Sequence, residues 1–464
     1  MKKRSFLLLG LFVLTMCLAA CSDDDYPSNV ADAIPDGEFR VLCLHIADTD
    51  RDGVISREEA LAVTKINCMP DASYLKTMSS LDGLRYFTNL ETLDCSNQNL
   101  TSLDVSGNPR LRRLLCYSNP LVSLDAGRCS ELETLLCGSC ELEYLQMPRT
   151  AALKELNCGS NRLTSLDVSG YSELWHLVCG DNLFTELNVD ACLDLVTLSC
   201  TCNITSDLSH HVKLFELHCE GLTCDRLDLS GHKRLNKLSI AHGRIKEIVF
   251  GDPAPLTSLT LNDVDCTSLD LSGCHRLNCL TLTDMPLSEL TLPEAVLSSV
   301  ALSQLPLERL EVKFPPYERD TDIPRMTVSD CDRLKHIDVS EQVMTFKCRN
   351  CPNLTTLNTD VFRYVEDFQC AGTALSSLDF SQWDGPRYVE IDCSYNRLTT
   401  LVLPSRIYTL SCQGNLLEEL DISGCSIGRI EWRPMETLRR IRLCRFTQEN
   451  LLGDTEGIEL VYVD

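Results

Sequence analysis

The sequence is short of positive charge. It contains 42 Lys and Arg against 67 Asp and Glu, which gives a formal net charge of −25 at pH 7. Nucleic acids and anionic membrane surfaces attract proteins through clustered basic residues. The charge balance therefore argues against both as electrostatic partners of this chain.

Long apolar runs are also scarce. The strongest one lies between Phe6 and Leu18, directly after Lys2, Lys3 and Arg4. It is too short to remain in a bilayer as a transmembrane helix. A basic start followed by a short apolar run is typical of an export signal. We therefore expect an exported chain with no integral membrane segment.

The usual catalytic signatures are missing as well. The sequence has no phosphate-binding loop, no nucleophile elbow, no zinc-protease helix motif and no dinucleotide-binding glycine motif. Its many carboxylates recur at the same place in a repeat, which predicts structural turn residues. We therefore expect a protein that is not an enzyme, although an active site assembled between repeats would leave no mark in the sequence. The recurring carboxylates include Asp104, Asp125, Asp167, Asp228, Asp270 and Asp379.

The end of the export signal resembles that of bacterial lipoproteins. Leu18-Ala19-Ala20-Cys21 is similar to a lipobox, and this resemblance implies that Cys21 is the lipidated first residue of the mature chain. The acidic run Ser22–Asp25 resembles the signal that sends Bacteroidetes lipoproteins to the outer face of the outer membrane. More than one acyl chain at Cys21 would anchor the protein stably. The alternatives are an ordinary secretory signal and a solvated acidic linker.

A calcium-loop pattern follows a predicted helix. Phe39, Leu42, Cys43 and Ile46 would share one helical face. From residue 48 to 59 every position of the EF-hand loop is filled, including the glycine needed for its sharp turn. The predicted Ca²⁺ ligands are Asp48, Asp50, Asp52, the Val54 carbonyl, Ser56 and Glu59.

This loop has no second copy in the sequence. EF-hands that act as sensors usually come in pairs, so a lone loop beside a repeat array indicates a structural clamp. The alternative is a solvated acidic turn. Calcium outside the cell is abundant enough to fill even a weak site.

The rest of the chain is built from a repeat. Leu90, Leu93 and Cys95 open the clearest copy, and the first leucine returns at steps of 21 residues as far as Leu195. One copy of 19 residues follows, the period then resumes to Leu277, and later copies are less regular. About eighteen copies can be counted, most of them 21 residues long, which indicates a solenoid of stacked units. The first inward position is occupied by Leu111, Leu132, Leu153, Leu174, Leu195, Leu214, Leu235, Leu256, Leu277, Leu297, Ile323, Val343, Val365, Tyr388, Ile407 and Ile427.

The repeat pattern resembles the leucine-rich-repeat family. Its length, with cysteine in the strand, is similar to the cysteine-ladder internalins and to Bacteroidetes surface lipoproteins that join one EF-hand to such repeats. This resemblance implies a curved solenoid with a parallel β-sheet on its concave face and short irregular or 3-10 convex segments. We expect a signal peptide at 1–20, a linker at 21–34, a calcium-binding cap at 35–66 and the solenoid at 67–464.

The 27 cysteines first suggest disulfides, because the chain is exported. Eleven of them instead share one inward position, which the middle copies fill with Ile240, Leu261, Leu282, Leu302 and Val328. The cysteines of this column are Cys95, Cys116, Cys137, Cys158, Cys179, Cys200, Cys219, Cys348, Cys370, Cys393 and Cys412. Neighbouring Cβ atoms on parallel strands would stand near 4.8 Å apart, longer than the about 3.8 Å of a disulfide. The pattern therefore predicts buried, stacked thiols. In the two C-x-x-C runs, Cys140 and Cys351 take a position that other copies give to asparagine, which favours a core role over a zinc or redox site.

The outward strand positions are mostly small and polar, with two exceptions. The first is a group of aromatic, apolar and basic residues that we expect to bind the ligand, because such residues dominate interface energies. The second is an arginine cluster formed by Arg429, Arg433, Arg440 and Arg442, which could equally neutralise Glu431 and Glu436. A proline-containing loop at 313–324 is a third possibility. The first group consists of Arg113, Leu115, Tyr117, Leu136, Trp175, His176 and Val178.

Three functions are compatible with these features. The first is a surface adhesin or interaction protein that binds a protein ligand from the host or from bacteria. The second is a calcium-dependent lipoprotein that captures glycans for nutrient uptake. The third, an enzyme, has no supporting motif. We favour the first.

Overall fold

The computed structural model describes the chain from residue 26 to 463 with short gaps. The described residues are 26–68, 77–149, 152–293, 295, 297–314, 324–339, 343–358, 362, 365–383, 388–445 and 455–463. They form two compact units that divide between Leu163 and Thr164. The expected signal peptide, Cys21 and most of the 313–324 loop lie outside the described residues. Within the described ranges, no helix is long and apolar enough to cross a membrane.

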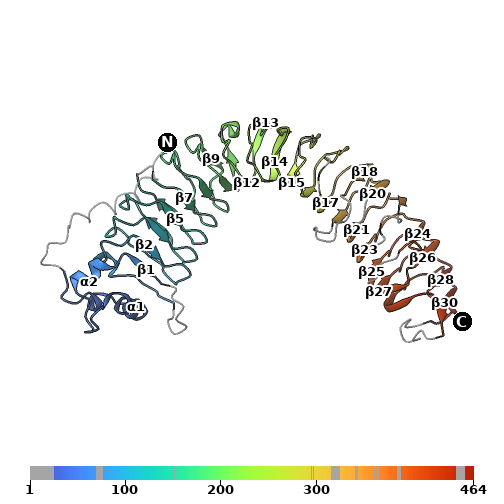
Figure 1. The fold of residues 1–464 in the computed structure, drawn as a ribbon, viewed down its shortest axis with the longest axis horizontal. Coiled ribbons are helices and arrows are strands. Elements are labelled where there is room, and N and C mark those ends of the chain that lie inside the picture. The colour runs from blue at the N-terminus through green and yellow to red at the C-terminus, as the bar shows by residue number, and fades with distance from the viewer. Residues whose placement is uncertain are drawn as a thin grey trace, which may run out of the picture. The chain divides into compact units, whose positions relative to one another are not determined.

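Unit 1 begins with a small helical cap (Figure 1). It contains η2 (Val30–Ala33), α1 (Gly37–Ala47) and α2 (Arg57–Ala62). Asp36 caps α1, because its Oδ1 accepts hydrogen bonds from the backbone N–H groups of Glu38 and Phe39. Phe39, Leu42 and Cys43 are buried, as the helical spacing predicts. Val30 and Ile34 are buried too, so the second half of the expected linker packs as part of the cap.

The cap leads into the first repeats of unit 1. Their strands pair in parallel, and Leu93, Leu114, Leu135 and Leu156 occupy one register, all fully buried. A single short turn cannot bury its apolar face alone, so stacking supplies the core. The strands and turns are β1 (Lys65–Asn67), η3 (Leu84–Tyr86), β2 (Thr92–Asp94), β3 (Arg113–Leu115), β5 (Thr134–Leu136) and β7 (Glu155–Asn157), with β4 (Ser123–Asp125) paired to β6 (Tyr144–Gln146) behind them.

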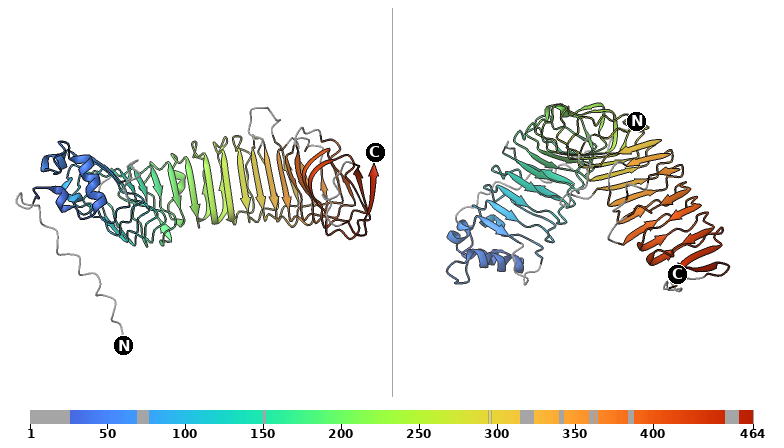
Figure 2. Two further views of the ribbon diagram at one scale, coloured as in Figure 1. Left: turned by 90° about the horizontal axis from the view of Figure 1, so that it is seen from below. Right: turned by 45° about the vertical axis from the view of Figure 1, so that its right-hand side comes forward.

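Unit 2 continues the same pattern over more turns. Figure 2 shows its strands side by side as a regular ladder. The ladder consists of β8 (His176–Val178), β10 (Thr197–Cys200), β12 (Glu216–Glu220), β14 (Lys237–Val249), β15 (Ser258–Val264), β16 (Cys279–Thr283), β17 (Ser299–Ser303), β19 (Arg325–Ser329), β21 (Thr345–Arg349), β23 (Asp367–Gln369), β25 (Val389–Asp392), β27 (Arg406–Ser411) and β29 (Ser426–Glu431). Both units are therefore parallel β-solenoids of the predicted leucine-rich-repeat type.

The opposite side of unit 2 is more regular than predicted. Besides one 3-10 turn, it carries short parallel strands that pair from one repeat to the next. These elements are β9 (Glu186–Leu187), β11 (Asn203–Ile204), η4 (Leu208–His210), β13 (Thr223–Asp228), β18 (Arg309–Val312), β20 (His336–Val339), β22 (Thr356–Leu357), β24 (Ser377–Asp379), β26 (Thr400–Val402), β28 (Glu419–Asp421), β30 (Arg440–Cys444) and β31 (Glu459–Val463).

One predicted core position is wrong. Tyr388 was expected to point inward, but its side chain is 53% exposed and Val389 is buried in its place. The register between β25 and β27 shifts between Val389 and Glu390, which moves the inward position by one residue. A one-residue shift turns a strand residue to the opposite face.

The predicted cysteine column is confirmed: its described thiols are buried, and none of them forms a disulfide. Where cysteine is absent, the register carries the column from Cys219 through Ile240 and Leu261 to Leu282, Leu302, Val328 and back to Cys348. Burial raises the pKa of the Cys158 and Cys412 thiols to about 12. The column therefore works as apolar core.

The asparagine that recurs after the strand forms hydrogen bonds to the backbone of two successive turns. Asn161 Nδ2 donates to the carbonyls of Cys137 at 3.0 Å and Cys158 at 2.9 Å, while its Oδ1 accepts from the Leu142 N–H at 3.0 Å. Asn119, Asn396 and Asn415 make equivalent sets of bonds. Cys140 takes the same place and donates a weaker S–H bond to the Cys116 carbonyl.

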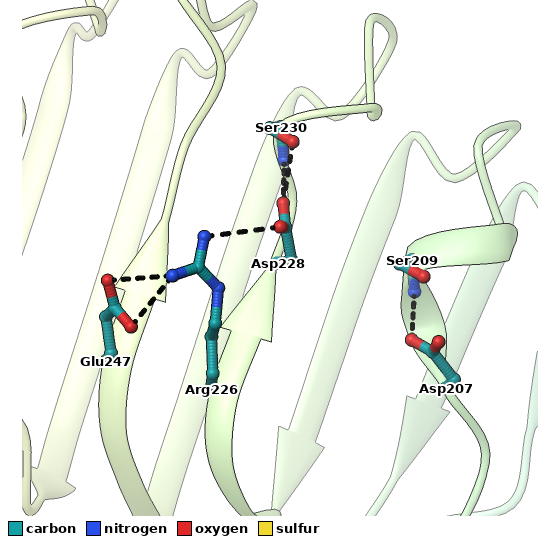
Figure 3. A network of polar contacts seen from close by, with 6 residues as sticks. All are labelled: Asp207, Ser209, Arg226, Asp228, Ser230 and Glu247. Atoms are coloured by element: carbon teal, nitrogen blue, oxygen red, sulfur yellow. Dashed lines mark hydrogen bonds and ion pairs between the residues drawn. The ribbon is translucent and has the colours of Figure 1, made fainter.

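The recurring aspartates are turn residues, as predicted. Asp228 Oδ1 accepts from the Ser230 N–H at 3.0 Å, and Asp207 does the same with Ser209 at 2.9 Å (Figure 3). Arg226 adds an ion pair with Glu247 on the next turn. Each aspartate thus satisfies a backbone donor at the start of a turn.

Candidate functional site

The predicted calcium loop places three carboxylates together. Asp48, Asp50 and Asp52 each offer an oxygen, and these oxygens lie within 4.8 Å of one another. The backbone turns through left-handed conformations at Arg51 (φ 64°) and Gly53 (φ 86°). Three clustered carboxylates repel one another unless a cation lies between them. Ca²⁺ is a hard cation that prefers oxygen ligands such as these carboxylates.

Two of the other predicted ligands, Ser56 and Glu59, meet at the end of the loop, and Glu59 is not among the three clustered carboxylates. Glu59 accepts hydrogen bonds from the N–H and hydroxyl of Ser56 and from the N–H of Thr49 at 2.7 Å. Ser56 in turn caps α2, forming a capping box with Glu59. The Val54 N–H donates to Asp52 at 2.8 Å. The structure therefore gathers the three aspartates, while Ser56 and Glu59 close the loop.

The hydrogen bonds to Glu59 also control its charge. Donors from the Ser56 and Thr49 backbone lower the pKa of this carboxyl to about 2. A depressed carboxyl pKa contributes stability above the unfolded value near 4.3, and that contribution is lost as the pH falls toward 2. Glu59 is therefore anionic at any neutral or mildly acidic pH.

The segment Asn29–Val30, which lies in the linker expected from the sequence, forms hydrogen bonds with the calcium loop. Asn29 Oδ1 accepts from the Ile55 N–H at 2.9 Å, and the Val30 N–H donates to the Ile55 carbonyl at 2.9 Å. Ile55 is fully buried. In the middle of the calcium loop, the chain thus pairs with its own N-terminal segment. No sequence periodicity marks this contact.

The expected ligand patch falls into two groups, one in each unit. In unit 1, Leu115 and Leu136 are register neighbours on β3 and β5, and both are half-buried. Arg113 is exposed and donates to the Thr134 hydroxyl at 3.2 Å. Tyr117 follows β3 and is also half-buried. This group presents a modest apolar surface.

In unit 2, Trp175 belongs to a longer apolar row than the sequence suggested. The Val196 N–H donates to the Trp175 carbonyl, and the Phe215 N–H donates to the Val196 carbonyl, both at 2.8 Å. Trp175 is 39% exposed and Phe215 is 40% exposed. We call Trp175, Val196 and Phe215 the apolar row. His176 and Val178 lie beside it on β8, and the Trp175 and His176 rings are 5.6 Å apart.

The arginines near the C-terminus are largely engaged with acidic residues. Arg429 pairs with Glu431 at 2.6 Å, and Arg440 bridges Glu419 and Glu459. Arg442 also pairs with Glu419. Arg433 instead lies over the Trp432 ring at 4.6 Å. This arrangement favours local charge neutralisation over an anion-binding site.

A groove of about 890 Å³ lies beside the cap in unit 1. Its lining includes the aspartates 32, 82, 104 and 125 and the arginines 85 and 128. Carboxylates outnumber guanidinium groups there, so the groove is unsuited to acidic ligands.

Solved structures resemble this chain, whereas no family model and no curated protein matches it. The functional domain of InlJ from Listeria monocytogenes, which includes a cysteine ladder, is 20% identical with a TM-score of 0.52, over 90% of this chain and 81% of that one. YopM from Yersinia enterocolitica is 18% identical with a TM-score of 0.57, over 95% of this chain and 97% of that one. These neighbours are leucine-rich-repeat proteins, and at such identities they establish the fold.

Proposed function

We propose that this chain, which has a leucine-rich-repeat fold, is a non-catalytic lipoprotein of the outer cell surface that binds a protein ligand. Lipidation at Cys21 would anchor it, and one Ca²⁺ would hold its cap in shape. Each unit provides a regular series of hydrogen-bonded turns, and regular elements of this kind are the usual support for binding surfaces.

The apolar row is the observation that carries this proposal. Two large aromatic side chains, each about two-fifths exposed, stand on a sheet edge whose other positions are mostly polar. Aromatic residues at exposed positions dominate protein interfaces, because they bury a large area at little entropic cost. The row therefore suits a protein ligand with its own apolar anchor.

Replacing Trp175 by Ala together with Phe215 by Ser should weaken binding of the ligand by about 2 kcal/mol, as expected for a hot spot. This corresponds to a roughly 30-fold higher Kd. The ligand is first captured from host mucus or neighbouring bacteria with the soluble chain, and affinity is then measured by surface plasmon resonance. Tyr144→Ser is the control, since Tyr144 is 55% exposed but lies outside the row.

Full affinity in the double variant would contradict this site. Tyr117→Ala with Leu136→Ser would then test the unit 1 group. Protease treatment of the captured material should abolish binding, whereas loss on periodate oxidation alone would favour the glycan-capture alternative.

We infer a structural role for calcium from the position of the loop. The aspartate cluster is joined to α2 through Glu59 and to the N-terminal segment through Ile55. Three repelling carboxylates at this junction would loosen it, and a bound cation would remove the repulsion. Calcium would thus stabilise the cap against local unfolding.

Calorimetry should detect one Ca²⁺ per chain, with the weak affinity of extracellular modules, a Kd near 10⁻⁴ to 10⁻³ M. At ten times its Kd the ion should stabilise the cap by about 1.4 kcal/mol. Asp48→Ala should remove both the heat and the thermal shift. Asp32→Ala, an acidic control in the same cap, should retain them. A wild-type chain without a calcium-dependent heat would rule the site out.

A further inference from the structure

Tyr26, the first residue that the structure describes, packs against the rest of unit 1. The Tyr26 hydroxyl donates to the Tyr86 carbonyl at 3.4 Å, and the two rings meet edge to face at 5.3 Å. The Arg57 guanidinium lies 5.1 Å from the centre of the Tyr26 ring. With Asn29 and Val30 also bonded to Ile55, the chain is fixed from its first described residues onward.

A second arginine completes this corner of unit 1. Arg85 Nη2 donates to the Tyr86 hydroxyl at 3.0 Å and lies 5.0 Å from the centre of that ring. Arg57 and Arg85 are both exposed. We call Tyr26, Arg57, Arg85 and Tyr86 the tether cluster. It joins α2 of the cap to η3 of the first repeats.

We propose that the tether cluster rests on the outer surface of the membrane and that Arg57 and Arg85 bind phosphate groups of its lipids. This inference rests on the proposed lipidation of Cys21. Only five residue steps separate Cys21 from Tyr26. Fully extended, they span at most about 18 Å. The cap therefore cannot move far from the headgroups that surround its own anchor.

The residue chemistry fits this partner. Guanidinium groups bind phosphate oxygens in a two-pronged geometry, and tyrosine is enriched where membranes meet water. The net charge of −25 opposes docking from free solution. The short segment between Cys21 and Tyr26 removes the need for long-range electrostatic attraction, because it raises the local concentration of headgroups around the tether cluster.

The competing occupant is the acidic segment Asp23–Asp25 of the chain itself. The groove beside Arg85 disfavours it, because the aspartates 32, 82, 104 and 125 line that groove against only two arginines. Like charges at such distances repel. Arg57 and Arg85 are both exposed, and Arg57 does not line the groove, so lipid phosphates can reach them from solvent.

The test uses the lipidated full chain in vesicles of phosphatidylethanolamine and phosphatidylglycerol that contain a headgroup nitroxide lipid. A fluorescent amino acid replaces Ser28, which is exposed and lies two residues from Tyr26. We expect strong quenching. A flexible spacer of about ten Gly and Ser residues is then inserted between Asp25 and Tyr26. It should lower the quenching to the level seen in control vesicles that lack the nitroxide lipid.

Two variants separate proximity from contact. Arg57→Gln with Arg85→Gln should reduce quenching in the chain with the short tether, whereas Arg128→Gln, a groove arginine outside the tether cluster, should not. Unchanged quenching in the double variant overturns the phosphate contact, and unchanged quenching with the spacer overturns the claim that the short linker after Cys21 is what keeps the cap at the membrane. Stronger quenching after replacing Asp23, Asp24 and Asp25 by Asn would assign the arginines to the acidic segment instead.

Failure of the underlying anchor gives a different result. A wild-type chain that does not float with the vesicles would refute lipidation at Cys21, and this inference with it. A chain that floats but shows no quenching at position 28 would refute this inference alone.

Discussion

Asn161→Ala should lower the free energy of unfolding of unit 1 by about 3 kcal/mol. The Asn161 side chain satisfies the buried carbonyls of Cys137 and Cys158 and the buried N–H of Leu142. A buried backbone group left without a partner costs about 1 to 3 kcal/mol. Alanine would leave several such groups unsatisfied where two turns meet. Urea unfolding followed by far-ultraviolet circular dichroism measures the loss.

Cys140 provides a matched control at the equivalent position of the preceding turn. Its thiol donates to the Cys116 carbonyl at 3.4 Å, a weaker bond than those of Asn161. Cys140→Ala should therefore cost less than about 1 kcal/mol. Equal effects at the two positions would mean that volume, and not hydrogen bonding, matters at this turn.

Phe368→Ala should destabilise unit 2 by about 3 to 5 kcal/mol. The Phe368 ring is fully buried and packs against Phe346 and Phe362, each at 5.4 Å, and against Phe380 at 5.0 Å. Removing a buried phenyl ring forfeits its transfer free energy and leaves a cavity. The contacts join two successive turns, so the loss would loosen both of them together.

Tryptophan fluorescence can follow this unfolding, because Trp175, Trp383 and Trp432 all belong to unit 2. Trp383 packs on Phe380 at 5.5 Å and so reports on the aromatic cluster directly. Phe368→Leu keeps most of the volume and should cost less than about 1.5 kcal/mol. A small effect from Phe368→Ala would show that the surrounding rings collapse into the space.

The repeat core was predictable because one rule applies to every turn. Leucine and cysteine recur at positions that face inward, and translation along the solenoid brings each onto its equivalent, as with Leu114 and Leu135. The prediction failed at Tyr388, where the register shift in β25 moves the inward position to Val389. Spacing alone does not reveal a bulge, since both residues are large enough to fill a core position.

The candidate sites were predictable only in part. The aspartates of the calcium loop lie close in sequence, so the motif indicates their meeting. The bond between Asn29 and Ile55 joins residues 26 positions apart without any periodic signal. Val196 and Phe215 were missed because only alternate strand positions were considered as outward, whereas their position precedes the regular strand. Arg440 was not matched to Glu459 because their contact depends on how β30 and β31 pair.

The uniform register of the turns has a consequence for how such a chain can change over generations. β3, β5 and β7 present the same pattern to one another at offsets of 21 residues. Losing or duplicating one complete period by unequal recombination would leave every remaining strand facing a compatible neighbour. We therefore expect the length of the array to vary readily among descendants of this gene, in whole periods, while the cap and its attachment stay unchanged.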